Sequence, residues 1–201
     1  MKKTPLIITY LLVLAAILLA AGSGEQLVKS LQNKFNSISD LSADFRQISN
    51  GKVSLAGKFY YGKGNKLRLD LKTLTIVSDG KTNWSYNKNQ KKVIISNYNP
   101  DDASIISLEN IINNYPSQCT VSMQKEGNSN ILNLIPVKSG LSFKHAKILI
   151  SPENLIQRID MVDQNNNPIQ IEFTNYRLNK DLNTSTFTFT PPEGSKVIDL
   201  R

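Results

Sequence analysis

The hydrophobic positions of this chain follow one period near the start and a different period afterwards. Between residues 27 and 38, apolar side chains recur at spacings of one, three, four and three residues. They are Leu27, Val28, Leu31, Phe35 and Ile38. This spacing puts them on one face of an α-helix. We therefore predict an amphipathic helix at the start of the folded domain.

A strand with two unlike faces is predicted at residues 66–72. Three leucines, Leu67, Leu69 and Leu71, alternate there with charged side chains. Successive side chains of a strand point to opposite faces of the sheet, so the leucines share one face and the charges share the other.

Residues 53–61 follow the same period of two. Leu55, Phe59 and Tyr61 share one parity, and Gly57 interrupts the apolar series. A glycine inside a strand marks either a bulge or a close approach of another backbone.

Turn residues divide most of the remaining chain into short strands. Asp79-Gly80 is a β-hairpin signal between the strand-like runs 75–77 and 84–86. Further runs with strand character, separated by Gly, Asn, Ser and Pro, are 93–96, 119–125, 131–137, 146–151, 156–163, 169–178 and 186–190.

A helical period returns once in the middle of the chain, and Pro116 ends it. The apolar residues of this second predicted helix are Ile105, Ile106, Leu108, Ile111, Ile112 and Tyr115.

These elements predict a mainly β fold. About ten to eleven short strands joined by tight turns favour a strongly curved antiparallel sheet, close to an incomplete barrel. The two apolar helices need a surface on which to bury their apolar stripes, so we expect them over the mouth or the concave side of the sheet.

The first 24 residues have the layout of a cleavable secretory signal. Lys2 and Lys3 precede an apolar run at 6–19, and small residues follow it. A retained membrane anchor is the alternative, but the run is shorter than the roughly 20 residues that a spanning helix needs. No cysteine stands at the cleavage point, as a lipoprotein would require. We predict cleavage near Gly22–Gly24 and a single soluble domain, 25–201, in a periplasm-like space.

The net charge of +8 is compatible with a partner that is acidic or a surface of anionic lipid head groups, and equally with a merely solubilising surface. Nucleic acid is a poor fit, because the basic residues are spread along the chain without an interleaved stacking motif.

Signs of catalysis are nearly absent. His145 is the only histidine and Cys119 the only cysteine, so a cysteine–histidine nucleophile has a single candidate pair and no metal-spaced cluster exists. We expect His145 on a strand surface and Cys119 as a small buried residue. The sequence indicates a protein that binds a ligand and is not an enzyme, without a cofactor or a metal.

Three stretches resemble a known family, the periplasmic outer-membrane lipoprotein carriers of the Lol sorting system. Residues 41–47 (LSADFRQ) resemble its first strand, 77–87 (VSDGKTNWSYN) its Trp-containing hairpin, and 187–194 (FTFTPPEG) its closing segment. Their order and separations cover essentially the whole chain after the leader.

The resemblance implies an incomplete barrel with a helical lid over an apolar cavity. It also implies that the cargo is acylated lipoproteins, received from an inner-membrane ABC transporter and given, where one exists, to an outer-membrane receptor. From the leader we expect the mature protein to be a monomer. The runner-up is a lipid-binding or envelope-stress sensor module of the same fold. An exported hydrolase is a more distant alternative.

Strand parity and the resemblance together indicate the candidate residues of the site. For each of them, the alternative to a role in binding is that it simply packs in the hydrophobic core. Lys63 stands where the family often has an arginine that holds the lid shut, and lysine offers a point charge in place of a planar fork of donors. The expected acyl-binding residues are Leu55, Phe59, Leu67, Leu69, Leu71 and Trp84. The expected lid residues are Ile105, Ile106, Ile111 and Ile112.

Overall fold

A computed structural model describes residues 24–99 and 107–201. The predicted leader therefore lies almost entirely outside the described residues, as do Ile105 and Ile106. The strands are β1 (Asp40–Ser49), β2 (Lys52–Gly62), β3 (Lys66–Leu71), β4 (Leu74–Asp79), β5 (Thr82–Asn87), β6 (Lys92–Asn97), β7 (Cys119–Glu126), β8 (Ser129–Pro136), β9 (Phe143–Ile150), β10 (Ile156–Asp163), β11 (Pro168–Leu178) and β12 (Lys196–Asp199).

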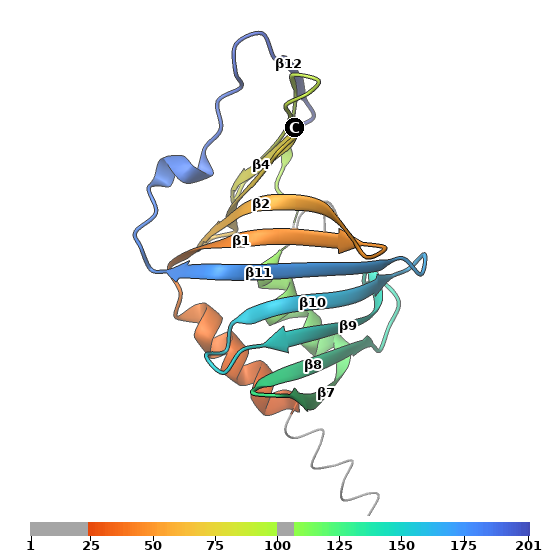
Figure 1. Cartoon of the computed structure of the whole chain (residues 1–201). Coiled ribbons are helices and arrows are strands. Elements are labelled where there is room, and N and C mark those ends of the chain that lie inside the picture. Colours follow the sequence, from red (N-terminus) through yellow and green to blue (C-terminus); the bar gives the residue numbers. More distant parts are fainter. Residues whose placement is uncertain (1–23, 100–106) are drawn as a thin grey trace, which may run out of the picture.

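All twelve strands belong to one sheet, in the order β12-β6-β5-β4-β3-β2-β1-β11-β10-β9-β8-β7. Every neighbouring pair is antiparallel except β12 and β6, which run parallel. The sheet curves strongly and its two edge strands do not meet (Figure 1). The predicted curved, mainly antiparallel sheet is confirmed, with one more strand than expected.

Aromatic side chains fill the centre of the concave face. Phe45 of β1 and Phe59 of β2 both pack edge-on against Phe173 of β11, with ring centroids 5.9 and 5.4 Å apart. All three rings are fully buried. Because Phe45 and Phe173 are directly paired across the β1–β11 ladder, their side chains must point to the same face.

The two predicted helical segments both cover the concave side. The first helix extends over 24–36, and its apolar stripe, including Leu31 and Phe35, is buried in the main core. Figure 1 shows it on the same side of the sheet as the segment that follows residue 106. The amphipathic helix at the start of the domain is confirmed.

The second helical segment is irregular. A π-helix, η1 (Asn110–Asn114), passes directly into a 3₁₀-helix, η2 (Tyr115–Gln118). Pro116 does not end the helical segment as predicted, because it lies in the first turn of η2, where its missing N–H is not needed.

Two glycines confirm the turn and strand chemistry read from the sequence. At Gly57 a Cβ would lie 1.9 Å from the carbonyl oxygen of Asp70, so glycine permits the close approach of β3 to β2. Gly80 adopts a φ of +91° in the β4–β5 hairpin. The Asp79 carboxylate accepts hydrogen bonds from the backbone N–H groups of Lys81 and Thr82, both at 2.8 Å, and fixes that turn.

The predicted strand at 186–190 is wrong. A 3₁₀-helix, η3 (Thr184–Phe187), occupies this region, with the Asn183 side chain accepting the N–H of Ser185 at its start. Phe187 turns onto the outer face of the sheet, where its ring lies about 3.0 Å from the Cβ position of Gly62. The chain then forms β12, which the sequence did not suggest. The alternating aromatic residues, Phe187 and Phe189, therefore pack against the outer face of the sheet and do not form a further strand.

Candidate functional site

The concave face of β2 and β3 holds most of the residues nominated for acyl binding. Leu69 pairs directly with Phe59, and Leu67 pairs with Tyr61, so these side chains share one face. Leu67, Leu69 and Leu71 are all buried in the main core, and Leu55 packs against its edge. The strict alternation in β3 therefore divides a buried apolar face from a more exposed charged face.

Trp84 does not belong to that face. It pairs with Val77 of β4 and Ile95 of β6, and Val77 in turn pairs with Arg68, which alternates with the leucines. Trp84 therefore lies on the outer face, and its predicted place beside the leucines is wrong. Apolar side chains form a separate outer cluster here, which we define as Val77, Val93, Ile95 and Phe187, with Trp84 beside them.

The two lid residues that the structure describes, Ile111 and Ile112, are buried in the main core on the concave side of the sheet. Ile111 and Ile112 of η1 are 7% and 2% exposed and belong to the main core cluster. A small cavity of about 20 Å³ lies between the first helix and the strands, with Phe35, Ile112 and Tyr176 among its lining residues. This cavity is too small to hold an acyl chain.

Lys63 makes no latch with the described part of the lid. Its side chain is exposed, and its backbone N–H donates to the carbonyl oxygen of Ser39 at 3.1 Å. Within residues 24–99 and 107–201, no hydrogen bond or ion pair involves its ammonium group. Lys63 is the first residue of the turn between β2 and β3, and its side chain extends into solvent.

Tyr61 and Glu109 are close neighbours at the junction of sheet and lid, which the sequence did not reveal. Tyr61 is a buried residue of β2, and Glu109 lies at the start of η1. Burial, with the negative charge of Glu109 as the next cause, raises the pKa of Tyr61 well above its usual range. Nothing in the local pattern around either residue signals this contact, because the two positions come together only through the fold.

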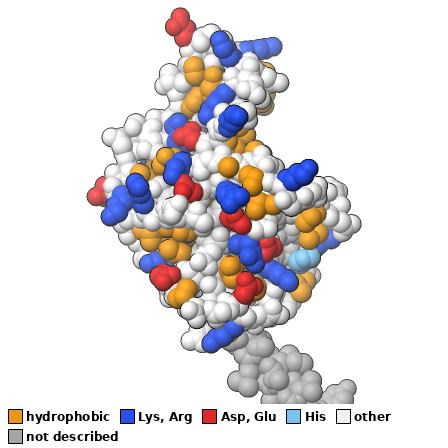
Figure 2. Space-filling view, in the orientation of Figure 1, with side chains coloured by type: hydrophobic (Ala, Val, Ile, Leu, Met, Phe, Trp, Pro, Cys, Tyr) orange, Lys and Arg blue, Asp and Glu red, His pale blue; other side chains and the backbone are white. Residues whose placement is uncertain are grey.

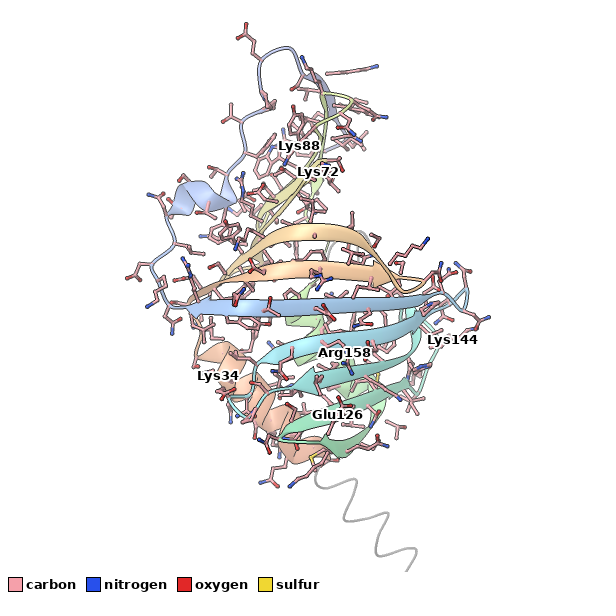
Figure 3. All side chains as sticks on the ribbon, viewed as in Figure 1. Lys34, Lys72, Lys88, Glu126, Lys144 and Arg158 are labelled. Atoms are coloured by element: carbon pink, nitrogen blue, oxygen red, sulfur yellow. The ribbon has the colours of Figure 1, made fainter. Side chains whose placement is uncertain are left out.

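Away from the outer cluster, the outer face of the sheet is polar and carries several ion pairs. Figure 2 shows basic and acidic side chains interspersed with small apolar areas on this side. Arg158 of β10 contacts Asp160 at 2.8 Å and Glu126 of β7 at 3.8 Å; Arg158 and Glu126 are labelled in Figure 3. Lys58 pairs with Asp44 in the same manner on β1 and β2. Because these pairs are largely solvated, they contribute little stability, but they mark the face that faces water.

Groups suited to catalysis are not brought together. His145 is exposed on β9, and burial raises the pKa of the half-buried Cys119 thiol, which disfavours the nucleophilic thiolate. Within the described residues, no three His, Cys, Asp or Glu side chains are grouped to hold a metal ion. In the same part of the chain, the helices are too short or too polar to span a bilayer.

The fold and the site together define the class of open, curved-sheet proteins in which helices cover an apolar concave face. The chain belongs to the outer membrane lipoprotein carrier family: the model of the family described as "Outer membrane lipoprotein carrier protein LolA" matches residues 36–190.

Curated relatives bear the same description. An outer-membrane lipoprotein carrier protein from Francisella tularensis subsp. novicida is 26% identical, with 99% of this chain and 98% of the relative covered. One from Legionella pneumophila is 25% identical, with 84% and 87% covered. Among solved structures, an uncharacterized conserved protein from Thermus thermophilus is similar in fold, with a TM-score of 0.62 at 12% identity over 88% of this chain and 99% of that one.

Proposed function

We propose that the protein is a periplasmic chaperone that shields the acyl chains of lipoproteins. In this proposal it receives them from an inner-membrane ABC transporter and gives them to the outer membrane. Family membership supports the choice of cargo. The single structural observation behind the proposal is the buried leucine face of β3, which the covering helices shield from water.

The energetics favour shielding over tight enclosure of the acyl chains. Burying a CH₂ group is worth about 0.8 kcal/mol, so three chains of roughly 16 carbons would contribute about 35–40 kcal/mol if fully buried. Non-covalent affinities reach at most about 20 kcal/mol. A carrier that must also release its cargo therefore needs loose contacts with aliphatic side chains, which Leu67, Leu69 and Leu71 offer.

The helical cover acts as the lid in this mechanism. Ile111 and Ile112 belong to the same buried core as the β3 leucines, so cargo that enters this core would compete with the lid for apolar surface. Such a lid must be docked by a small free energy difference, because the cargo has to displace it. The hydrogen bond from the Gln32 side chain of the first helix to the Ile112 carbonyl oxygen, at 3.1 Å, supplies a polar link of that modest size.

The proposed location of the mature chain, 25–201, is the periplasm, and it is based on the leader. The apolar run at 6–19 with its preceding lysines directs export and is then removed. The mature protein works in the periplasm as a monomer, and the outer-membrane receptor is the partner to which the cargo passes.

The experiment is a release and transfer assay. Inner-membrane vesicles that contain the transporter and a radiolabelled lipoprotein are incubated with ATP and the purified protein. We expect the lipoprotein to appear in a soluble complex with the protein and then in added outer membranes. Lipoprotein that stays in the vesicles at every concentration of active, folded protein would overturn the proposal.

A further inference from the structure

One row of the concave face changes from apolar to polar as it crosses the sheet. Its members are directly paired from strand to strand. In the order β1 to β6 they are Leu41, Tyr61, Leu67, Ser78, Asn83 and Ser96. The row thus places three short polar side chains immediately beside the leucine face.

Asn83 is the unusual member of this row. Its side chain is buried, with 5% exposed, yet neither its amide nitrogen nor its amide oxygen has a hydrogen-bond partner in the described part of the chain. The neighbouring Ser78 uses its hydroxyl oxygen to accept the N–H of Gly80 at 3.1 Å. Asn83 therefore keeps both a donor and an acceptor unused at the edge of the apolar surface.

An asparagine in this state destabilises the folded protein. Buried polar groups are normally paired, and an unpaired one loses its hydration without compensation. Leucine has the same number of side-chain heavy atoms with the same branching and would lose no hydrogen bonds at this position. The fold alone therefore gives no reason for an amide at this position, whereas a ligand with complementary polar groups does.

We propose that Asn83 binds the polar linkage of an acylated ligand, that is, the ester or amide groups that join its acyl chains to the rest of the molecule. This inference rests on the proposed function. The Asn83 NH₂ group donates to an ester carbonyl oxygen, and the amide oxygen is free to accept an N–H. Leu67 and Leu69, two strands away on the same face, contact the acyl chains beyond the linkage.

This placement gives the site a preference that an apolar surface lacks. Hydrocarbon alone can slide along the leucines, because dispersion and hydrophobic contacts have no direction. A hydrogen bond to the linkage fixes where each chain begins. Ser96 of β6 pairs directly with Asn83 and places a hydroxyl group next to the Asn83 amide on the same face of the sheet.

The test compares two probes on the purified full-length mature protein. One is a synthetic diacylglyceryl-cysteine peptide with ester linkages, and the other is its dialkyl ether analogue, which lacks the carbonyl oxygens. For the wild type we expect the ester probe to bind about five- to tenfold more tightly, the usual effect of one hydrogen bond. For Asn83→Leu we expect that ratio to fall to about one, while the melting temperature stays equal or rises.

Asn133→Leu is the matched control. Asn133 of β8 also has an unpaired amide nitrogen, but it alternates with the buried Leu132 and Leu134 and therefore lies on the outer face. We expect it to keep the ester preference of the wild type. If the leucine variant does not fold, the ratio of the two affinities is measured on Asn83→Ala instead. A general loss of affinity in that variant lowers both values and cancels in their ratio.

The outcomes separate the two proposals. A wild type that binds neither probe contradicts the proposed function itself. A wild type that binds both probes equally, or an Asn83 variant that retains the ester preference, overturns the inference about Asn83 and leaves the carrier function standing.

Discussion

Gln32 on the first helix donates its side-chain N–H to the backbone carbonyl oxygen of Ile112, at 3.1 Å. The two segments that cover the concave face are thus joined to each other as well as to the sheet. Ile112 is buried, so its carbonyl group has little water with which to replace that bond.

Gln32→Ala should loosen the cover. Loss of the bond to Ile112 is worth about 1 kcal/mol, so amide hydrogen exchange over 108–118 should speed up by roughly fivefold. Hydrogen exchange followed by mass spectrometry measures it. Gln26→Ala on the exposed side of the same helix is the control and should leave these amides unchanged. Equal exchange in both variants would mean that the two segments open independently.

Leu69→Glu should abolish lipoprotein transfer. The substitution places a carboxylate in the middle of the leucine face, at a cost of several kcal/mol to the closed form and to any acyl complex. The transfer assay is run beside circular dichroism, which establishes that the variant is folded. A folded Leu69→Glu protein with wild-type transfer would show that cargo binds elsewhere.

Trp84→Ala should affect stability without affecting cargo. Trp84 is half-buried on the outer face, so its loss removes packing against the outer cluster and costs roughly 2 kcal/mol. Urea denaturation measures the loss. Transfer per folded molecule should equal that of the wild type; a selective loss of transfer at full stability would return Trp84 to the cargo site.

Tyr61→Phe should open the lid more than Lys63→Leu does. The first variant removes a hydroxyl that lies close to the Glu109 carboxylate at the start of η1, and the loss of such a polar contact costs about 1 kcal/mol. The second changes an exposed side chain that makes no polar contact in the described structure, and its effect should be within about 0.5 kcal/mol. The readout is the rate at which a cysteine placed at Ile111 reacts with a thiol reagent, in a Cys119→Ser background. A larger effect at Lys63 would restore the predicted latch.

The sequence predicts the leucine face well because only one side of β3 is strongly apolar. Lys66, Arg68 and Asp70 mark the opposite face without ambiguity, and the aligned register carries Phe59 to the same side as the leucines. The first helix is equally well predicted, since its apolar stripe has a single sheet to cover.

The prediction for Trp84 is wrong because the parity rule fails where both faces of a strand are covered. In β5 the inward residues are Asn83 and Ser85, whereas the outward residue is the large aromatic. The C-terminal segment places Phe187 beside Gly62 of β2 and the Phe189 ring 5.7 Å from that of Tyr86 of β5, so apolar side chains find partners on the outer face as well. That long-range return of the chain leaves no trace in the local period.

The outer cluster has a mechanical consequence. Because β4 contributes Ile76 to the main core and Val77 to the outer cluster, bending this part of the sheet would disturb packing on both of its faces, and close-packed interiors resist such strain. The wall that presents Leu67, Leu69 and Leu71 is therefore stiff, and volume for an incoming chain has to come from displacement of the helices. Binding and release of cargo would then be movements of the covering helices against a rigid part of the sheet. The C-terminal segment, packed on the outer face, would help to keep that part of the sheet rigid.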